Sequence, residues 1–260
     1  LGTVIGDIVG YPYEFNNIKT KDFELFTEKS QFSDDTVLTV ALAHSILDDK
    51  PYEGYLERYG KKYPHAGYGG NFVKWIWLAN KKPYNSWGNG SAMRVSPIAW
   101  AYDDEITVME KAKESAECTH NHPEGIKGAQ AIALAIYMAR VGGQKKDIKG
   151  TIEDLFDYDI NESCDSLRKW YKFDVSCKGT VPPAIRCFLE SNNFEQAIRL
   201  AVSIGGDSDT LAAITGSIAE AYYGGIPKEI LVKIVNLLDD DLLDVIRRFR
   251  SKFIKGREWE

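Results

Sequence analysis

Apolar residues recur at helical spacing in most of the long segments of this chain. Stretches with this pattern cover residues 36–48, 107–117, 128–140, 195–204, 211–223 and 228–254. A period of three to four residues places apolar side chains on one face of a helix. The alternation of apolar and polar residues that is typical of strands between hairpin turns is hard to find. The sequence therefore predicts an all-α fold, a compact orthogonal helical bundle.

Composition and spacing indicate one folded unit. Of the 260 residues, 44% are hydrophobic and 27% are charged, so the chain has enough apolar material for a sizeable core. No linker rich in Gly, Ser or Pro divides the chain, and the polar stretch 142–166 is the best candidate for an insertion. We predict a single domain over residues 1–260.

Charge and cysteine content narrow the classes of function. The net charge of -6 argues against a general nucleic-acid binder, because phosphate contacts need a surplus of positive groups. No stretch of about 18 residues is apolar enough to span a bilayer, and the N-terminal segment is a poor signal peptide because it carries Asp7 and no basic run. The four cysteines lack C-x-x-C spacing, which suits a reducing compartment. We expect a cytoplasmic protein with no membrane contact, and a monomer, because the sequence shows no strong association surface.

Two acidic segments of similar composition each precede an apolar helical stretch. They are Ser33-Asp34-Asp35-Thr36 and Asp207-Ser208-Asp209-Thr210. A carboxylate at a helix start accepts backbone N–H bonds and is stabilised by the helix dipole, so one aspartate in each segment is explained as a cap. The second aspartate in each segment needs another purpose. If the two helix starts face each other, four carboxylates converge, and their repulsion has to be neutralised by cations.

The chemistry of these side chains indicates which cations would bind. Carboxylate and hydroxyl oxygens suit hard ions such as Mg²⁺, Mn²⁺ or Ca²⁺, whereas zinc prefers nitrogen and sulfur. This amount of acid favours a binuclear metal centre in a cleft between the two helix starts. The alternative is that all four aspartates are ordinary helix-capping residues.

The N-terminal segment adds a further candidate. Gly2, Gly6 and Gly10 recur every four residues, which puts them on one helical face and lets another backbone approach closely. Glu14 follows this segment, among apolar residues. A glutamate in such surroundings can be a general acid or base with a raised pKa. The alternative is an ordinary surface glutamate.

Two glycine-rich stretches, 65–70 and 87–94, are candidates for ligand contacts. Such loops expose backbone N–H groups that bind phosphate, although neither matches a Walker motif and no G-x-G-x-x-G follows a strand. The alternative is that both are flexible loops. The aromatic residues around them are expected to be mostly core, although one of them can stack on a base. His122, before Pro123, fits a helix N-cap, and His120 fits a polar contact to a ligand.

Five motifs appear in the order in which they occur in the ADP-ribosylglycohydrolase family, and the chain resembles this family nearly end to end. They are GDIVGYPYE, SDDT, GNGSAMRVSPIAW, THNHPEG and SIGGDSDTLAAITGSIAEAYYG. Each motif alone is weak, but five in order are highly specific. The resemblance implies an all-helical enzyme with two divalent cations, Mg²⁺ or Mn²⁺, at the acidic helix ends. The family's metal ligands match Ser33, Asp34, Asp35, Asp207, Asp209 and Thr210.

The resemblance also implies roles in binding and catalysis. Glu14 matches a flexible glutamate of the family, and Glu14, Asp34 or Asp35 would orient or deprotonate a water molecule; we choose Glu14 for proton transfer. The family's ADP-ribose contacts match Gly88, Asn89, Gly90, Ser91, Met93 and His120. The implied reaction is hydrolysis of the N- or O-glycosidic bond between ADP-ribose and a modified acceptor, through an oxocarbenium-like state.

Two other functions fit the same residues. One is a protein that binds ADP-ribose without turnover, although the retained acidic set argues against it. The other is a Mg²⁺-dependent phosphohydrolase acting on nucleotides or sugar phosphates. The acceptor stays open, because arginine, serine, a nucleic-acid end or a free metabolite would present the same distal ribose. The choice between Mg²⁺ and Mn²⁺ is equally open.

Overall fold

The computed structural model describes residues 1–254, and within them the fold is all-α, as predicted. The only β-type pairing in this part of the chain is an isolated antiparallel bridge between Gly88 and Ser176. The single domain predicted over 1–260 stays a prediction, and its last residues, 255–260, lie outside the described part of the chain.

The helices follow one another along the chain with short connections, apart from the long segments 14–33 and 77–89. They are α1 (Gly2–Gly10), the 3-10 helix η1 (Tyr11–Tyr13), α2 (Asp34–Asp48), α3 (Tyr52–Lys62), α4 (Gly70–Ile76), α5 (Gly90–Met93), α6 (Ser96–Ala101), α7 (Glu105–Glu117), α8 (Pro123–Arg140), α9 (Lys145–Phe156), α10 (Cys164–Trp170), α11 (Cys177–Glu190), α12 (Phe194–Ser203), α13 (Ser208–Tyr223), α14 (Lys228–Val235) and α15 (Asp240–Phe253).

Each predicted helical stretch contains a helix. The stretch 228–254 divides into α14 and α15, because the carboxylate of Asp239 accepts a hydrogen bond from the backbone N–H of Leu242 (2.9 Å) and so caps a new helix. The candidate insertion 142–166 holds α9 and the start of α10, which are packed parts of the fold.

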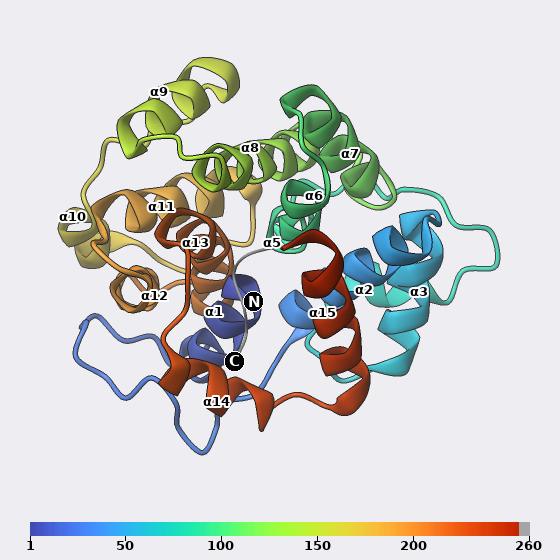
Figure 1. Cartoon of the computed structure of the whole chain (residues 1–260), viewed down its shortest axis with the longest axis horizontal. Coiled ribbons are helices and arrows are strands. Elements are labelled where there is room, and N and C mark those ends of the chain that lie inside the picture. Colours follow the sequence, from blue (N-terminus) through green and yellow to red (C-terminus); the bar gives the residue numbers. More distant parts are fainter. Residues whose placement is uncertain (255–260) are drawn as a thin grey trace.

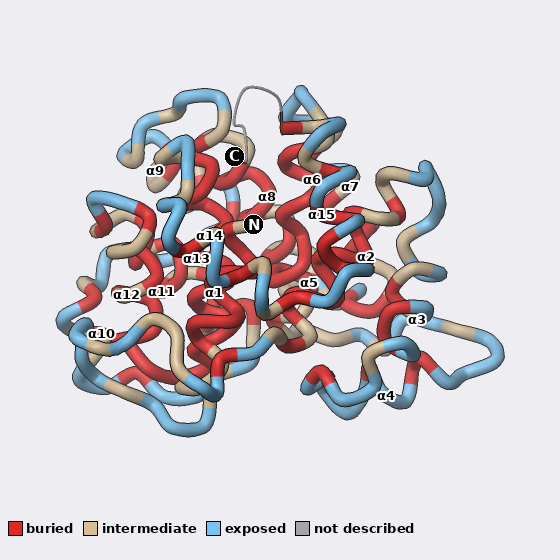
Figure 2. Tube along the Cα trace, turned by 60° about the horizontal axis from the view of Figure 1, so that its bottom comes forward, coloured by how far each residue is buried: buried red, intermediate tan, exposed pale blue. Residues whose placement is uncertain are grey.

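Helix α1 lies in the middle of the molecule beside α13 (Figure 1), and every residue of α1 is buried. The glycines of α1 allow this closeness: a Cβ atom on Gly6 would lie 2.0 Å from the carbonyl oxygen of Ala212 on α13. The predicted close approach of another backbone is therefore present. Helices α8, α11 and α12 also pack on α13, and Figure 2 shows the buried residues gathered along α1, α8 and α13.

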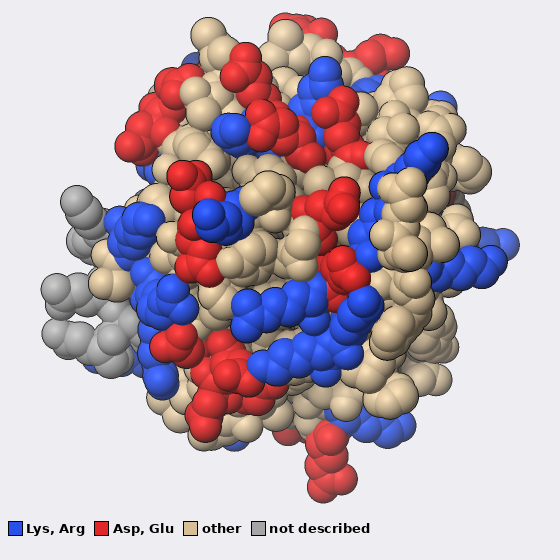
Figure 3. All heavy atoms as spheres, turned by 90° about the vertical axis from the view of Figure 1, so that its right-hand side faces the viewer, with Lys and Arg blue, Asp and Glu red and all other residues tan. Residues whose placement is uncertain are grey.

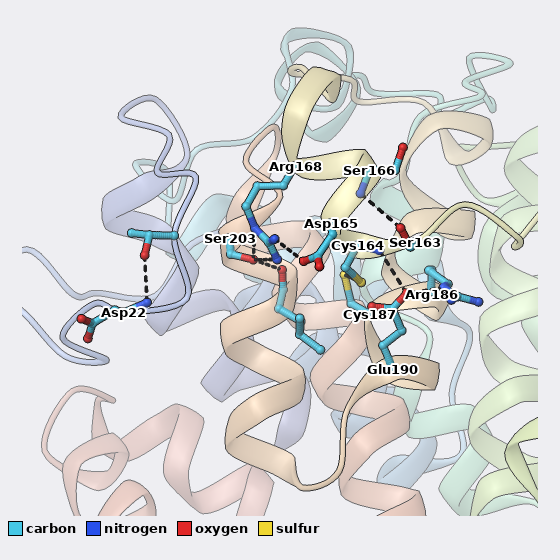
Figure 4. A network of polar contacts seen from close by, with 12 residues as sticks. Asp22, Ser163, Cys164, Asp165, Ser166, Arg168, Arg186, Cys187, Glu190 and Ser203 are labelled. Carbon is cyan, nitrogen blue, oxygen red and sulfur yellow. Dashed lines mark hydrogen bonds and ion pairs between the residues drawn. The ribbon is translucent and has the colours of Figure 1, made fainter.

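Polar contacts fasten α10 to its neighbours (Figure 4). The guanidinium of Arg168 donates to the hydroxyl of Ser203 on α12 and pairs with Asp165 within α10. The backbone N–H of Cys164 donates to the carboxylate of Glu190 on α11 (3.1 Å). The segment 171–176 that follows α10 has its own contacts: the hydroxyl of Tyr171 donates to the carbonyl of Gly179, and the carbonyl of Val175 accepts from the backbone N–H of Asn89.

The face that carries α3 has mixed charge (Figure 3). Lys and Arg side chains lie among Asp and Glu side chains, with pairs such as Lys61 with Glu57 (2.6 Å) and Arg248 with Asp48 (3.6 Å). Exposed pairs of this kind contribute about 0–1 kcal/mol each to stability. Within residues 1–254, none of the helices has the length and apolar character that crossing a membrane requires.

Candidate active site

The starts of α2 and α13 lie next to each other, as predicted from the two acidic segments. The hydroxyl of Thr210 donates to the carboxylate of Asp35 over 3.1 Å, although the two residues are 175 positions apart. Before α13 the chain turns at Gly205 and Gly206, whose φ angles of +72° and +82° favour glycine. These turns bring Asp207 and Asp209 to the same place as Asp34 and Asp35.

Asp7 of α1 holds the start of α2 in place. Its buried carboxylate accepts hydrogen bonds from the backbone N–H and hydroxyl groups of Ser33 (2.9 and 2.7 Å) and of Thr36 (3.0 and 2.5 Å). Asp7 is not among the site residues predicted from the sequence. The signal that could have found it is an aspartate alone among apolar and glycine residues of a helix, since such a carboxylate needs partners.

Carboxylate oxygens gather in two overlapping groups. Oxygens of Asp7, Asp35 and Asp209 lie within 4.8 Å of one another, and so do oxygens of Glu14, Asp207 and Asp209. The residue shared by both groups, Asp209, lies in the first turn of α13.

None of the four aspartates in the two acidic segments supplies the N-cap hydrogen bond of α2 or α13. The cap of α2 is the hydroxyl of Ser33, which accepts from the backbone N–H of Asp35, and Asp207 makes no side-chain cap bond at α13. One buried oxygen of Asp35, Oδ1, has no hydrogen-bond partner among the described residues. The interpretation of the aspartates as ordinary caps therefore does not account for their positions.

Crowding of the acids changes their protonation. Burial, and then the neighbouring carboxylates, raise the pKa of Asp34, Asp35 and Asp209 well above the usual range. Burial raises the pKa of Asp207 to about 6. Burial, followed by the negative charges of Asp209 and Asp7, raises the pKa of Glu14 to about 8. Such shifts mean that the ionised groups repel one another and lack counter-charge.

This donor set fits hard divalent cations. The group supplies carboxylate and hydroxyl oxygens, one of them an orphaned buried oxygen of Asp35, and nothing in it is a sulfur or an imidazole nitrogen. A bound dication would relieve the repulsion that the raised pKa values reveal.

The acidic group opens into a cleft of about 330 Å³. Its opposite wall is the loop before α5 with Tyr84 and His120, and the segment after α10 contributes Phe173 and Val175. A wider surface hollow of about 1040 Å³ beside α14 is lined by residues of both charges, including Glu24, Glu28, Lys29 and Lys233. The grouped acids lie in the smaller cleft, so the chemistry belongs there.

Most of the predicted site residues line this cleft together. They are Glu14, Asp34, Asp35, Gly88, Asn89, Gly90, Met93, His120, Asp207, Asp209 and Thr210. The two that do not are Ser33 and Ser91, both buried. The hydroxyl of Ser33 donates to Asp7, and that of Ser91 donates to the carbonyl of Gly125 over 2.7 Å.

The loop before α5 is only partly available to a ligand. The backbone N–H of Gly88 donates to Ser86, and that of Asn89 donates to the carbonyl of Val175 (2.7 Å). The side chain of Asn89 donates to the carboxylate of Asp207 over 2.7 Å, which ties this loop to the start of α13. The backbone N–H groups of Gly90 and Ser91 have no backbone partner among the described residues.

Both predicted roles for the histidines have a structural counterpart. The Nδ1 atom of His122 accepts from the backbone N–H of Glu124 (3.1 Å), which makes His122 the predicted N-cap of α8. His120 lines the cleft and is nearly buried. Burial, and then the positive charge of Arg94, lower the pKa of His120 well below the usual range, so its ring is neutral.

The fold and the site define a helical protein with a carboxylate-lined cleft suited to divalent cations. The family model for ADP-ribosylglycohydrolases matches residues 1–258. The chain therefore belongs to the ADP-ribosylglycohydrolase family, and it is an enzyme of that family.

Individual relatives agree with this assignment. The chain is 28% identical to ADP-ribosylhydrolase ARH3 of Homo sapiens, over 76% of this chain and 72% of that protein. It is 26% identical to ADP-ribosylarginine hydrolase Tri1 of Pseudomonas putida, over 90% of this chain and 72% of that protein. A solved chain described as an ADP-ribosylglycohydrolase-related protein complex superimposes with a TM-score of 0.71 at 23% identity, covering 96% of this chain and 94% of the other. That last likeness concerns the fold alone.

Proposed function

We propose that this chain is a divalent-metal-dependent hydrolase that cleaves the N- or O-glycosidic bond between ADP-ribose and a modified acceptor. The observation that carries the proposal is the meeting of two acidic helix starts, with Glu14 beside them, at one end of a cleft. The names of the relatives support ADP-ribose as the shared part of the substrate.

Two Mg²⁺ or Mn²⁺ ions would be held by the carboxylates of Asp34, Asp35, Asp207 and Asp209 and by the hydroxyl of Thr210. Ser33 would add its hydroxyl oxygen, which can bind a cation through a lone pair while its hydrogen is donated to Asp7. When bound, such ions supply Lewis acidity at ribose hydroxyls and at a water molecule.

Glu14 moves the proton in this proposal. Burial and the charges of Asp209 and Asp7 raise the pKa of Glu14 to about 8 in the metal-free protein. Bound cations would offset those charges and lower this pKa, so the ionised carboxylate could accept a proton and return it. One of its carboxylate oxygens lies within 4.8 Å of oxygens of Asp207 and Asp209, which supports a role for Glu14 beside the proposed metal ligands. Glu14 would take a proton from the water whose oxygen bonds to C1 of the ribose, and it would return that proton to the acceptor atom as the bond between C1 and the acceptor breaks.

The remainder of ADP-ribose would lie along the opposite wall. The backbone N–H of Gly90, which has no backbone partner among the described residues, would donate to the diphosphate, and Met93 and His120, which line the cleft, would contact the ligand. Trp87, next to this loop and 59% exposed, is suited to stack on the adenine.

The test is hydrolysis of ADP-ribosylated arginine and serine peptides, with excess Mg²⁺ or Mn²⁺ and with excess EDTA. We expect release of ADP-ribose that EDTA abolishes and that Asp209→Asn reduces by at least about 100-fold, because a charged group is lost from the reacting centre. The matched control is Glu28→Gln, which changes an exposed acid in the other hollow. Full activity in EDTA would refute the metal dependence. ADP-ribose binding without turnover on any acceptor, or phosphate release instead, would refute the proposed reaction.

A further inference from the structure

Glu14 lies just past the end of a helix, so no helix fixes the position of its side chain. Helix η1 ends at Tyr13, and the next helix, α2, begins only at Asp34. The backbone N–H of Glu14 donates to the carbonyl of Tyr11 over 3.3 Å, which is long for a hydrogen bond. A side chain on such a segment keeps one position only if other contacts hold the segment.

The side chain of Asn17 supplies such contacts at the end of η1. Its Nδ2 atom donates to the carbonyl oxygens of Tyr13, over 2.7 Å, and of Glu14, over 2.9 Å. A helix leaves its last carbonyl groups without a partner inside the helix. The amide of Asn17 satisfies them and thereby fixes the backbone of Glu14 relative to residue 17.

The same amide group pairs with Gly206, in the turn that leads into α13. Its Nδ2 atom also lies 2.8 Å from the carbonyl oxygen of Gly206, and the backbone N–H of Gly206 donates to Oδ1 over 2.7 Å. Exchanging the oxygen and nitrogen of the amide would bring two acceptors together at one contact and two donors at the other. The pairing therefore sets the orientation of the Asn17 side chain.

Gly206 depends on this pairing more than Asn17 does. Gly206 is buried, whereas Asn17 is exposed, and the N–H of Gly206 has no other acceptor among the described residues. A buried N–H without a partner is unfavourable. Gly206 also has the left-handed conformation, with a φ angle of +82°, and Asp207 follows it directly. Contacts that hold Gly206 therefore hold the start of α13.

Asn17 connects the two segments whose carboxylates meet in the cleft. Glu14 lies three residues before Asn17, and Asp207 lies one residue after Gly206. Carboxylate oxygens of Glu14, Asp207 and Asp209 lie within 4.8 Å of one another. The connection is thus made next to the point at which the three carboxylates converge.

Two neighbours of Asn17 contact the same region without duplicating its bonds. The Nζ atom of Lys19 donates to the carbonyls of Ile204 and of Tyr171, the latter over 2.8 Å. The ring of Phe15 stacks on that of Phe173, with centroids 5.8 Å apart. Neither side chain makes a hydrogen bond to the backbone of residue 14 or 206, so Asn17 alone provides that link among the described residues.

We propose that Asn17 is a positioning residue, which holds the segment of Glu14 against the turn before Asp207 and so keeps the carboxylate of Glu14 beside the acidic group. The proton transfer by Glu14 rests on the proposed function, whereas the connection made by Asn17 does not. Asn17 is not among the residues that line the cleft, so it acts through Glu14 and not on a ligand.

Amide hydrogen exchange measures the connection in the protein without metal or ligand. The matched control for Asn17→Ala is Asn16→Ala, since the side chain of Asn16 lies at the other hollow and makes no hydrogen bond to any described residue. We expect the N–H of Gly206 to exchange at least about 5-fold faster in Asn17→Ala, the effect of one hydrogen bond, and at the wild-type rate in the control. Equal exchange of Gly206 in all three proteins would overturn the proposal.

A double-mutant cycle tests whether Asn17 acts through Glu14. Asn17→Ala should lower kcat for an ADP-ribosylated peptide by about 10- to 100-fold, the effect of moving a catalytic group by about 1 Å, and should change KM by less than about 3-fold. In Glu14→Gln protein, whose residual kcat lacks this proton transfer, the same change should lower kcat by less than about 3-fold. Equal losses in both backgrounds, or an unchanged kcat in Asn17→Ala, would refute positioning through Glu14.

Urea denaturation of the variants separates this role from a general loss of stability, which would not depend on the residue at position 14. If Asn17→Ala does not fold, Asn17→Asp replaces it in the cycle, because a carboxylate can accept from Gly206 but cannot donate to the three carbonyls. If the wild-type protein hydrolyses no ADP-ribosylated peptide, the proposed function fails, while the exchange of Gly206 still decides whether Asn17 makes the connection.

Discussion

Replacing Gly6 with alanine would insert a methyl group into the contact between α1 and α13. The new Cβ would lie 2.0 Å from the carbonyl oxygen of Ala212 and 2.2 Å from its carbonyl carbon, whereas ordinary contact begins at 3.4 Å. These atoms belong to the backbone, so no side chain can turn aside. The two helices would have to separate by about 1 Å or more along their contact.

The loss of stability that a separation of this size would cause can be estimated. A gap of about 0.5–1 Å removes a quarter to a half of the dispersion attraction between the atoms that face it. Overpacking of a core typically costs about 1–3 kcal/mol, and an all-backbone clash belongs at the upper end or beyond. The better helix propensity of alanine returns about 1 kcal/mol at most. We therefore expect the free energy of unfolding to fall by about 3 kcal/mol or more.

The substitution should also weaken cation binding, because α1 carries Asp7 and α13 carries Asp209. Urea denaturation in chelator measures the first effect, and titration with Mn²⁺ measures the second. The control is Gly54→Ala in α3, where a Cβ would meet nothing within 4 Å and where we expect unchanged or slightly raised stability. If Gly6→Ala stays within about 0.5 kcal/mol of wild type and binds Mn²⁺ equally well, the role assigned to this helix contact is wrong.

Three further perturbations address the acidic group itself. Asp7→Asn replaces one of the two oxygens that accept from Ser33 and Thr36 with an N–H donor, so at least one of these donors loses its acceptor. Both the melting temperature in chelator and the Mn²⁺ affinity should therefore fall; unchanged Mn²⁺ titrations would contradict this. In metal-free protein, the free energy of unfolding should decrease as the pH rises from about 5 to 8. The reason is that Glu14 and Asp207, with pKa values raised to about 8 and about 6, keep protons in the folded protein that the unfolded chain has already lost. Urea denaturation at several pH values measures this dependence, and a free energy of unfolding that rises with pH would contradict it. Asn89→Ala removes a donor to Asp207 and should lower kcat or metal affinity by about 10- to 100-fold in steady-state assays, with less loss of stability than Gly6→Ala.

The helical elements could be predicted from sequence because their apolar period is a local property. The apolar period predicts a single helical stretch over 228–254, because the period carries no information on the carboxylate of Asp239, which caps α15. The meeting of the two acidic segments could also be inferred, because two carboxylates in each segment exceed what a cap needs.

Other features depend on contacts between distant residues. Asp7 has a role only because α1 lies against the start of α2, and the hydroxyl of Ser91 points away from the cleft because it reaches Gly125 on another helix. Likewise, the backbone N–H groups of Gly88 and Asn89 have partners inside the fold. Neither composition nor spacing reports which way such groups point.

The position of α1 couples the stability of the fold to its candidate chemistry. Burying these carboxyl groups next to one another is unfavourable, as their raised pKa values indicate. The favourable free energy of the packing that holds them together therefore has to exceed this cost. That packing is the contact of α1 with α13, and the tie to α2 is the carboxylate of Asp7. A cation that binds the folded form alone would add to stability, by about 2.7 kcal/mol at a concentration 100 times its Kd. The same helix therefore holds the acids together in the metal-free protein and sets the spacing that a pair of ions would meet.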